Sequence, residues 1–160
     1  GINSLIPIDM LSVSRISHAS QRLFEGELIR TVLKNKFDGK LTFTLKELLG
    51  TWSENAALFS VGETVTGVVR SVESYGVFVE LMPNLAGLAE PCDDLVPGQC
   101  VSVYIKSIIP DKMKIKLVIV QAFDSAAVQS ELVYFDERDH IDSWHFSPTG
   151  AIKTVETYFE

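Results

Sequence analysis

Two aromatic residues in the middle of the chain, Tyr75 and Phe78, have side chains suited to stacking on a nucleic-acid base. Over 77–81, aliphatic residues alternate with Phe78 and Glu80, and a period of two is typical of a strand that buries one face. This pattern predicts that Phe78 and Glu80 point outward. A ring on the wet face of a strand offers a surface for an unpaired base. The alternative interpretation places Tyr75 and Phe78 in the core.

Lysines occupy the same predicted outward register on two later strands. Tyr104 and Lys106 alternate with inward aliphatic residues over 101–106, and Lys114 and Lys116 do the same over 114–119. A row of ammonium groups can follow a phosphate backbone, and solvated surface is an equally good explanation of each lysine alone. Four lysines nearer the N-terminus could extend the row: Lys34, Lys36, Lys40 and Lys46.

Catalytic and metal-binding patterns are not evident. Cys92 and Cys100 lack metal-ligand spacing and indicate no disulfide framework. The three histidines, at 18, 140 and 145, share no site with them in the sequence. We therefore expect no enzyme, no metal and no cofactor. No apolar stretch approaches the roughly 18 residues of a membrane span, so we expect no membrane partner. No secretory signal opens the sequence and the cysteines indicate no disulfides, so we expect a cytoplasmic protein.

The net charge of −7 is unfavourable for binding nucleic acid, but it is unevenly distributed. Residues 1–59 carry about +1, residues 60–120 carry −2 and residues 121–160 carry −6. Because phosphate contacts dominate nucleic-acid affinity, a weak binder is the better expectation. Most of the acidity lies in the C-terminal tail.

Five short alternating segments over 61–120 predict a small closed barrel. The predicted strands are 62–70, 75–81, 85–90, 101–106 and 114–119. Gly62 and Gly98 suit the turns that open the first and fourth strands, and Gly67 suits a close approach of two backbones. The predicted fold is mainly β, with a five-stranded oligonucleotide-binding barrel (OB-fold).

The glycine and valine pattern of this segment resembles the S-one RNA-binding domain, named from the ribosomal protein S-one family. The resemblance is carried, in the right order, by the Gly67, Tyr75–Val79, Leu85–Leu88, Gly98–Val103 and Ile115–Leu117 motifs. The whole chain also resembles the C-terminal part of clostridial-type S-one domain proteins. The resemblance implies single-stranded RNA as partner, with the small ribosomal subunit as a further candidate.

The family's RNA-binding positions are only partly matched. Tyr75 and Phe78 stand at its two aromatic positions, and Lys114 stands where an arginine is usual. Glu90 replaces a histidine and Ile109 replaces an aspartate. The resemblance thus implies an RNA face with reduced affinity that includes Tyr75, Phe78 and Lys114. The outward register of the later strands adds Tyr104, Lys106 and Lys116 to the predicted face.

Residues 1–49 repeat the pattern of the second half of the barrel, which predicts the last three strands of a partial S-one repeat. The expected strands are 5–11, 28–33 and 41–46. An open sheet edge favours pairing with other strands. We expect the tail to cover this half-barrel. A homodimer through the incomplete first repeat is the alternative.

The remaining segments are a connector and a small α+β tail. Residues 50–60 form the connector, within a predicted short helical stretch over 47–59 whose packing residues are Trp52 and Leu58. Residues 121–160 are expected to form a loop over 124–129 and a hairpin over 132–146. A C-terminal helix over 151–159 then follows a Ser-Pro cap at 147–148.

Weak binding of single-stranded RNA with little sequence preference, in bacterial translation or RNA metabolism, is therefore the expected function. The alternative is a degenerate barrel that acts as a protein–protein interaction module and uses the acidic tail to dock a basic partner. The retained aromatics and lysines favour RNA. The replaced histidine and aspartate positions and the net charge favour the alternative.

Overall fold

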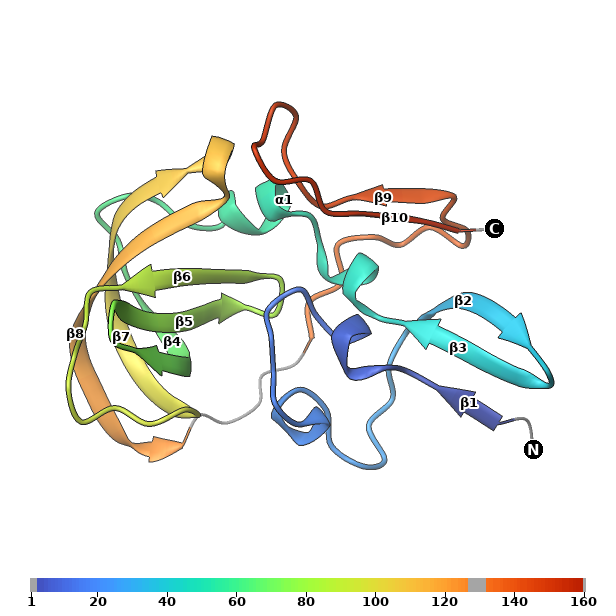
Figure 1. Ribbon diagram of the computed structural model, residues 1–160, viewed down its shortest axis with the longest axis horizontal. Helices are drawn as coiled ribbons and strands as arrows, with labels where there is room; N and C mark the ends of the chain where they lie inside the picture. Colours follow the sequence, from blue (N-terminus) through green and yellow to red (C-terminus); the bar gives the residue numbers. More distant parts are fainter. Residues whose placement is uncertain (1–2, 127–131, 160) are drawn as a thin grey trace.

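The computed structural model describes residues 3–126 and 132–159. Its centre is a closed five-stranded barrel in which the strand order is β4-β5-β6-β8-β7 (Figure 1). The strands are β4 (Thr64–Glu73), β5 (Gly76–Met82), β6 (Leu85–Ala89), β7 (Gln99–Ile109) and β8 (Lys114–Ala126). The β6–β8 pair is parallel, and the other pairs of the barrel are antiparallel. The predicted five-stranded barrel is confirmed, with its last two strands longer than expected.

Alternating aliphatic residues fill the barrel as the sequence predicts. Val101, Val103 and Ile105 of β7 are fully buried, and Ile115 and Leu117 of β8 are 1% exposed. This burial removes apolar surface from water and is the main source of stability. A Cβ at Gly67 would lie 2.5 Å from Val79 Cγ1 and 3.0 Å from the Glu80 carbonyl oxygen. The close approach at Gly67 therefore has a structural cause: β5 passes where a side chain would be.

A second, smaller sheet precedes the barrel. It consists of β1 (Asn3–Leu5), β2 (Val32–Phe37) and β3 (Lys40–Thr44), in the order β1-β3-β2. β1 pairs with β3 in parallel, and β2 pairs with β3 antiparallel. This is the pairing pattern of β6, β8 and β7 in the barrel. It supports our proposal that residues 1–49 are the second half of an S-one repeat.

Two of the three predicted N-terminal strands were misplaced. β1 stops before Pro7, which lacks an N–H, and Ile8–Met10 forms a 3-10 turn. Leu28 lies in a loop and is 98% exposed. Two residues further on, the Arg30 N–H donates to the Tyr134 hydroxyl at 3.1 Å and joins no strand ladder.

The connector is helical, as predicted. A 3-10 turn over Lys46–Leu49 leads to α1 (Trp52–Ala56), which begins with a capping box formed by Thr51 and Glu54. Trp52 is 4% exposed and belongs to the barrel's core cluster. Leu58 is 54% exposed, so its predicted packing role was wrong. Phe59, the next residue, packs against the core instead.

The tail contains no helix over 151–159, and this prediction was wrong. Its strands are β9 (Ser143–His145) and β10 (Glu156–Tyr158), which pair antiparallel. Gly150 has φ +83, a left-handed conformation that separates 151–159 from the predicted Ser-Pro cap at 147–148. The residues that follow are rich in β-branched and aromatic types, which favour a strand.

The predicted hairpin over 132–146 was also wrong, because residues 132–142 form no strand. β9 uses β10 as its partner. β8 continues through 124–126, where a loop was expected, and the rest of that expected loop, 127–129, lies outside the described residues. No helix in the described part of the chain is long and apolar enough to cross a membrane.

The tail covers both earlier units. Leu132 and Tyr134 pack against the N-terminal cluster of Leu11, Leu45 and Leu49, and the Phe135 N–H donates to the Leu48 carbonyl at 2.8 Å. Three residues of the β9–β10 region pack with the barrel core instead: Trp144, Phe146 and Val155. The expected contribution of the tail to the cover of residues 1–49 is thus confirmed for 132–135. The later aromatics bury against the barrel.

Candidate nucleic-acid interface

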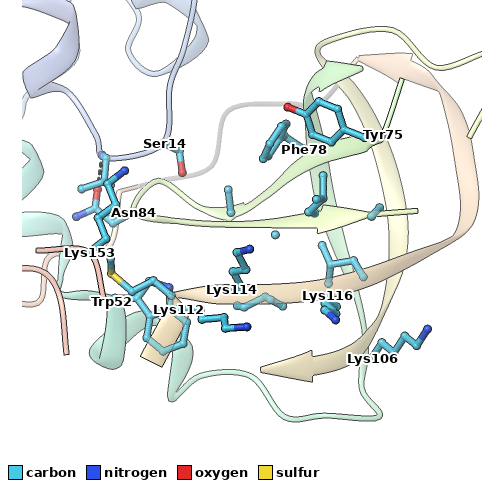
Figure 2. Close-up of a pocket in the computed structure, with 18 of the residues that line it drawn as sticks. Ser14, Trp52, Tyr75, Phe78, Asn84, Lys106, Lys112, Lys114, Lys116 and Lys153 are labelled. Carbon is cyan, nitrogen blue, oxygen red and sulfur yellow. Dashed lines mark hydrogen bonds between the residues drawn. The ribbon is translucent and has the colours of Figure 1, made fainter. Parts of the chain in front are cut away.

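A groove of about 790 Å³ runs over the outer face of the barrel (Figure 2). Its floor is formed by β6 and by the first residues of β8, and Phe78 of β5 stands at its side. The turn over Pro110–Lys112, which joins β7 to β8, contributes Lys112. The groove is therefore built on barrel strands and on the turns and segments that lie beside them.

Five of the six predicted site residues line this groove: Tyr75, Phe78, Lys106, Lys114 and Lys116. Tyr104 is not among the lining residues. It is 39% exposed and lies between Thr64 of β4 and Val118 of β8 in the register of the barrel. The four lysines of residues 34–46 that could have extended the row do not line the groove either.

The two aromatic rings form a pair at one side of the groove. Their centroids are 6.1 Å apart and their planes meet at 83°, an edge-to-face arrangement. Tyr75 is 62% exposed, and Phe78 is half-buried and lies outside the core cluster. The outward position predicted for Phe78 agrees with this location.

The groove is strongly cationic although the chain is acidic. Among the described residues, five lysines line it, Lys106, Lys112, Lys114, Lys116 and Lys153, and Glu90 is the single charged residue of opposite sign. The lining thus carries +4 on a chain of −7. Concentrated positive charge in a concave site attracts anions beyond what the net charge indicates.

Glu90 holds one of these lysines. Its Oε1 lies 3.3 Å from Lys106 Nζ, and the two side chains are 63% and 58% exposed. An exposed pair of this kind is worth at most about 1 kcal/mol. A phosphate can therefore displace Glu90 from Lys106 at small cost, but the carboxylate remains a local repulsive charge.

Glu80 was expected on the solvent-exposed face of its strand, but the structure buries it. Its side chain is on the outer side of β5, as the alternation requires, but it is only 6% exposed. Arg22 from the N-terminal segment donates to both carboxylate oxygens at 2.8 and 2.5 Å, and Arg70 adds a contact at 3.2 Å. The N-terminal segment thus covers one part of the outer face, and the groove occupies another.

The end of the groove away from Tyr75 is made by residues that lie outside the barrel strands. Figure 2 places Trp52, Asn84 and Lys153 there, with Ser14 above them. Asn84 fixes this end because its Oδ1 accepts from the Val13 N–H at 2.9 Å and its Nδ2 donates to the Lys46 and Gly50 carbonyls. Sequence reasoning missed Asn84, Lys112 and Lys153. For Asn84, the turn position after Pro83 was the only local signal.

The closed barrel and the cationic groove with aromatic rings define the class of protein: an oligonucleotide-binding barrel. No family model matches the chain. Similarity to individual proteins is more specific. Small ribosomal subunit protein bS1 of Chlamydia muridarum is 32% identical over 132 residues, which cover 73% of this chain and 23% of that protein.

Two further relatives extend the comparison. The bS1 homolog of Bacillus cereus is 25% identical over 166 residues, which cover 95% of this chain and 43% of that protein. A 4-hydroxy-3-methylbut-2-enyl diphosphate reductase of Clostridium tetani is 29% identical over 138 residues, 78% of this chain and 22% of that protein. The chain is therefore a homologue of bacterial ribosomal protein bS1 and carries an S-one-type barrel. It spans less than half the length of these relatives.

Proposed function

We propose that this chain binds single-stranded RNA weakly and with little sequence preference, in bacterial translation or RNA metabolism. The observation that carries the proposal is the groove charge of +4 beside two aromatic rings, on a chain of −7. The lysines would take phosphates and the rings would take bases, the usual division of labour in single-strand binding. The names of the bS1 relatives agree with this proposal and make the small ribosomal subunit the proposed further partner.

The expected low specificity has a structural argument. Base edges are read by polar side chains with free donors and acceptors. Asn84 is the lining residue best equipped for this, but its amide is already engaged with Val13, Lys46 and Gly50. Stacking on Tyr75 and Phe78 accepts any base. RNA affinity should then depend on charge and stacking more than on the base sequence of the RNA.

The expected low affinity follows from Glu90 and Ile109. Glu90 adds a negative charge inside the groove. Ile109 has an aliphatic side chain next to Lys114 across the β7–β8 ladder, where a polar group could have bonded a sugar or base. Each replacement removes a favourable contact without disturbing the barrel.

A titration with fluorescent oligouridylate at about 50 and about 200 mM salt tests the proposal. The wild-type chain should bind, and its affinity should fall with salt by about 0.7 logarithmic units per phosphate contact per tenfold change. The double variant Lys114→Ala/Lys116→Ala should bind more weakly with a flatter salt slope. The matched control, Lys34→Ala/Lys36→Ala, removes two lysines from β2 outside the groove and should bind as the wild type does. Equal binding by both double variants would overturn the proposal.

One observation favours a second candidate, a protein-interaction role. Leu5, Leu33 and Phe37 of the N-terminal sheet are 62%, 49% and 79% exposed, and β2 is an edge strand. A second copy pairing through β2 would form a homodimer. Lys34 and Lys36 on β2 oppose that pairing, because lysines on an edge repel a like strand. Sedimentation velocity over a range of concentrations decides it: a mass that stays constant and monomeric excludes the homodimer.

A further inference from the structure

We propose that the loop between β9 and β10 adds a phosphate contact, through Lys153, at the end of the groove beyond the barrel. This inference rests on the proposed RNA binding and extends it to a segment that is not part of the barrel. It predicts a longer RNA footprint than the five strands alone provide. The argument depends on how the loop is held, on the state of its lysine and on the charge of the tail.

The loop is fixed to the barrel at both of its ends. Phe146 on one side and Val155 on the other pack with the barrel core, and their backbones are joined by a hydrogen bond of 2.9 Å. Within the loop, the Ile152 N–H donates to the Asp111 carbonyl at 2.9 Å. Asp111 lies in the turn that also carries Lys112. The residue next to Lys153 is thus bonded directly to the rim of the groove.

Lys153 is available to an anion. It is exposed and lines the groove, and no carboxylate of the described residues lies within ion-pair distance of it. Lys112 and Lys114 are likewise outside these ion pairs. Figure 2 places Lys112, Lys114 and Lys116 in succession along the groove, with Lys153 toward Trp52 at one end and Lys106 toward the other. A strand that follows this row reaches Lys153 last.

The charge of the tail makes this placement informative. Residues 121–160 carry two cationic and eight acidic side chains. One of the two cations, Arg138, is held by Asp136 at 2.6 Å and lies outside the groove. The other is Lys153. An acidic segment would repel RNA, so the free cation at the groove offsets that repulsion where the tail comes nearest to the strand.

The ligand chemistry that fits is a phosphodiester. Two aromatic residues line this end of the groove beside Asn84 and Ser14, and these two rings, Trp52 and Phe146, are each only 4% exposed. Neither ring presents a face for stacking. We therefore assign this end to backbone contact, while Tyr75, 62% exposed, takes the base at the other end.

Lys153→Ala tests the assignment in the full chain with two fluorescent oligouridylates, a long one that spans the groove and a short one of about four nucleotides. The variant should bind the long RNA roughly threefold or more weakly and lose about 0.7 of salt slope. It should bind the short RNA as the wild type does, because stacking on Tyr75 and Phe78 holds a short RNA at the opposite end of the groove. Lys153→Arg should restore binding of the long RNA. Lys36→Ala, an exposed lysine of β2, is the matched control.

The outcomes separate the two proposals. If the wild type binds and Lys114→Ala weakens binding, but Lys153→Ala changes neither affinity nor slope, the loop contact is wrong and the barrel proposal stands. If Lys153→Ala weakens short and long RNA equally, the contact is not at a separate end, which also overturns the inference. If the wild type binds neither RNA, both proposals fall. Thermal unfolding of each variant should match the wild type, because the lysine is exposed.

Discussion

Arg22 forms a bidentate ion pair with Glu80, which lies 58 residues later in the sequence. Its Nη1 donates to Oε2 at 2.8 Å and its Nη2 donates to Oε1 at 2.5 Å. The side chains are 5% and 6% exposed. Arg22 Nη2 also donates to Ser12 at 3.1 Å. This ion pair joins the segment that precedes the barrel to the outer side of β5, so the two parts of the chain are held by charge as well as by apolar packing.

Removing Arg22 should destabilise the protein strongly. A buried ion pair that loses one partner leaves an uncompensated charge, at a cost of about 3–5 kcal/mol. We expect the lower end for Arg22→Ala, because Arg70 still contacts Glu80 at 3.2 Å. Urea unfolding measures the change. Arg15→Ala, an exposed arginine of the same segment, is the control and should be neutral. An Arg22→Ala chain as stable as the control would contradict this account.

The barrel was predictable because its information is local. Alternation over 77–81 or 101–106 identifies an inward face from a few neighbouring residues, and Val77, Val79 and Val103 are all fully buried. Turn glycines add to this, since Gly62 and Gly98 have φ of +90 and +92. The resemblance to the S-one domain supplied the type of barrel. It also supplied the face on which Tyr75 and Phe78 stand.

The errors arose where distant segments decide the outcome. Alternation placed Glu80 outside correctly, but only the position of Arg22 shows that this outside is buried. The segment 151–159 has apolar residues at a helical spacing, yet the Phe146–Val155 backbone bond draws it into a hairpin. Lys153 was missed for the same reason. It joins the groove through the docking of the tail, which no local pattern reveals.

A second prediction concerns the tail as part of the barrel core. Trp144 is 4% exposed in the core cluster, whereas Tyr158 on the paired strand is 67% exposed. Trp144→Ala should cost about 3–5 kcal/mol, the usual range for a large buried side chain. Tyr158→Ala should cost little and serves as the control. Chemical denaturation with fluorescence detection can follow both variants through Trp52, which each of them keeps. If Trp144→Ala is as stable as Tyr158→Ala, the tail does not contribute to the stability of the barrel core.

A third prediction separates stacking from packing at the aromatic pair. Phe78→Ala and Tyr75→Ala should each weaken RNA binding by about 1–3 kcal/mol. Tyr75→Ala should change stability little, because the ring is 62% exposed. Phe78→Leu keeps apolar volume without the ring and is the matched variant for the half-buried site. If Phe78→Ala is destabilised but its folded fraction binds RNA as the wild type does, the Phe78 ring serves packing and not stacking.

A fourth prediction concerns pH. Hydrogen bonds from the Arg138 side chain hold the pKa of Asp136 below its ordinary value, against the opposing effect of burial. A lowered pKa in the folded state favours folding when the carboxylate is ionised, and that stability is lost as pH falls through the folded pKa. Arg138 is 59% exposed, so the effect should stay below about 1 kcal/mol. Asp136→Asn should therefore be slightly less stable at neutral pH and equal to the wild type in strong acid. If Asp136→Asn is still less stable than the wild type in strong acid, the loss comes from altered packing and not from the charge of Asp136.

The last prediction concerns the carboxylate inside the groove. Glu90 stands among five lysines and holds Lys106 at 3.3 Å. Glu90→Gln removes the negative charge, releases Lys106 and keeps the side-chain size, so RNA should bind more tightly and with a steeper salt slope. Glu90→His should strengthen binding most, because a histidine side chain can itself contact the RNA. Glu63→Gln, an exposed carboxylate outside the groove, controls for the change in net charge. If Glu63→Gln strengthens binding as much as Glu90→Gln, the gain comes from overall charge, and the groove is not where the RNA lies.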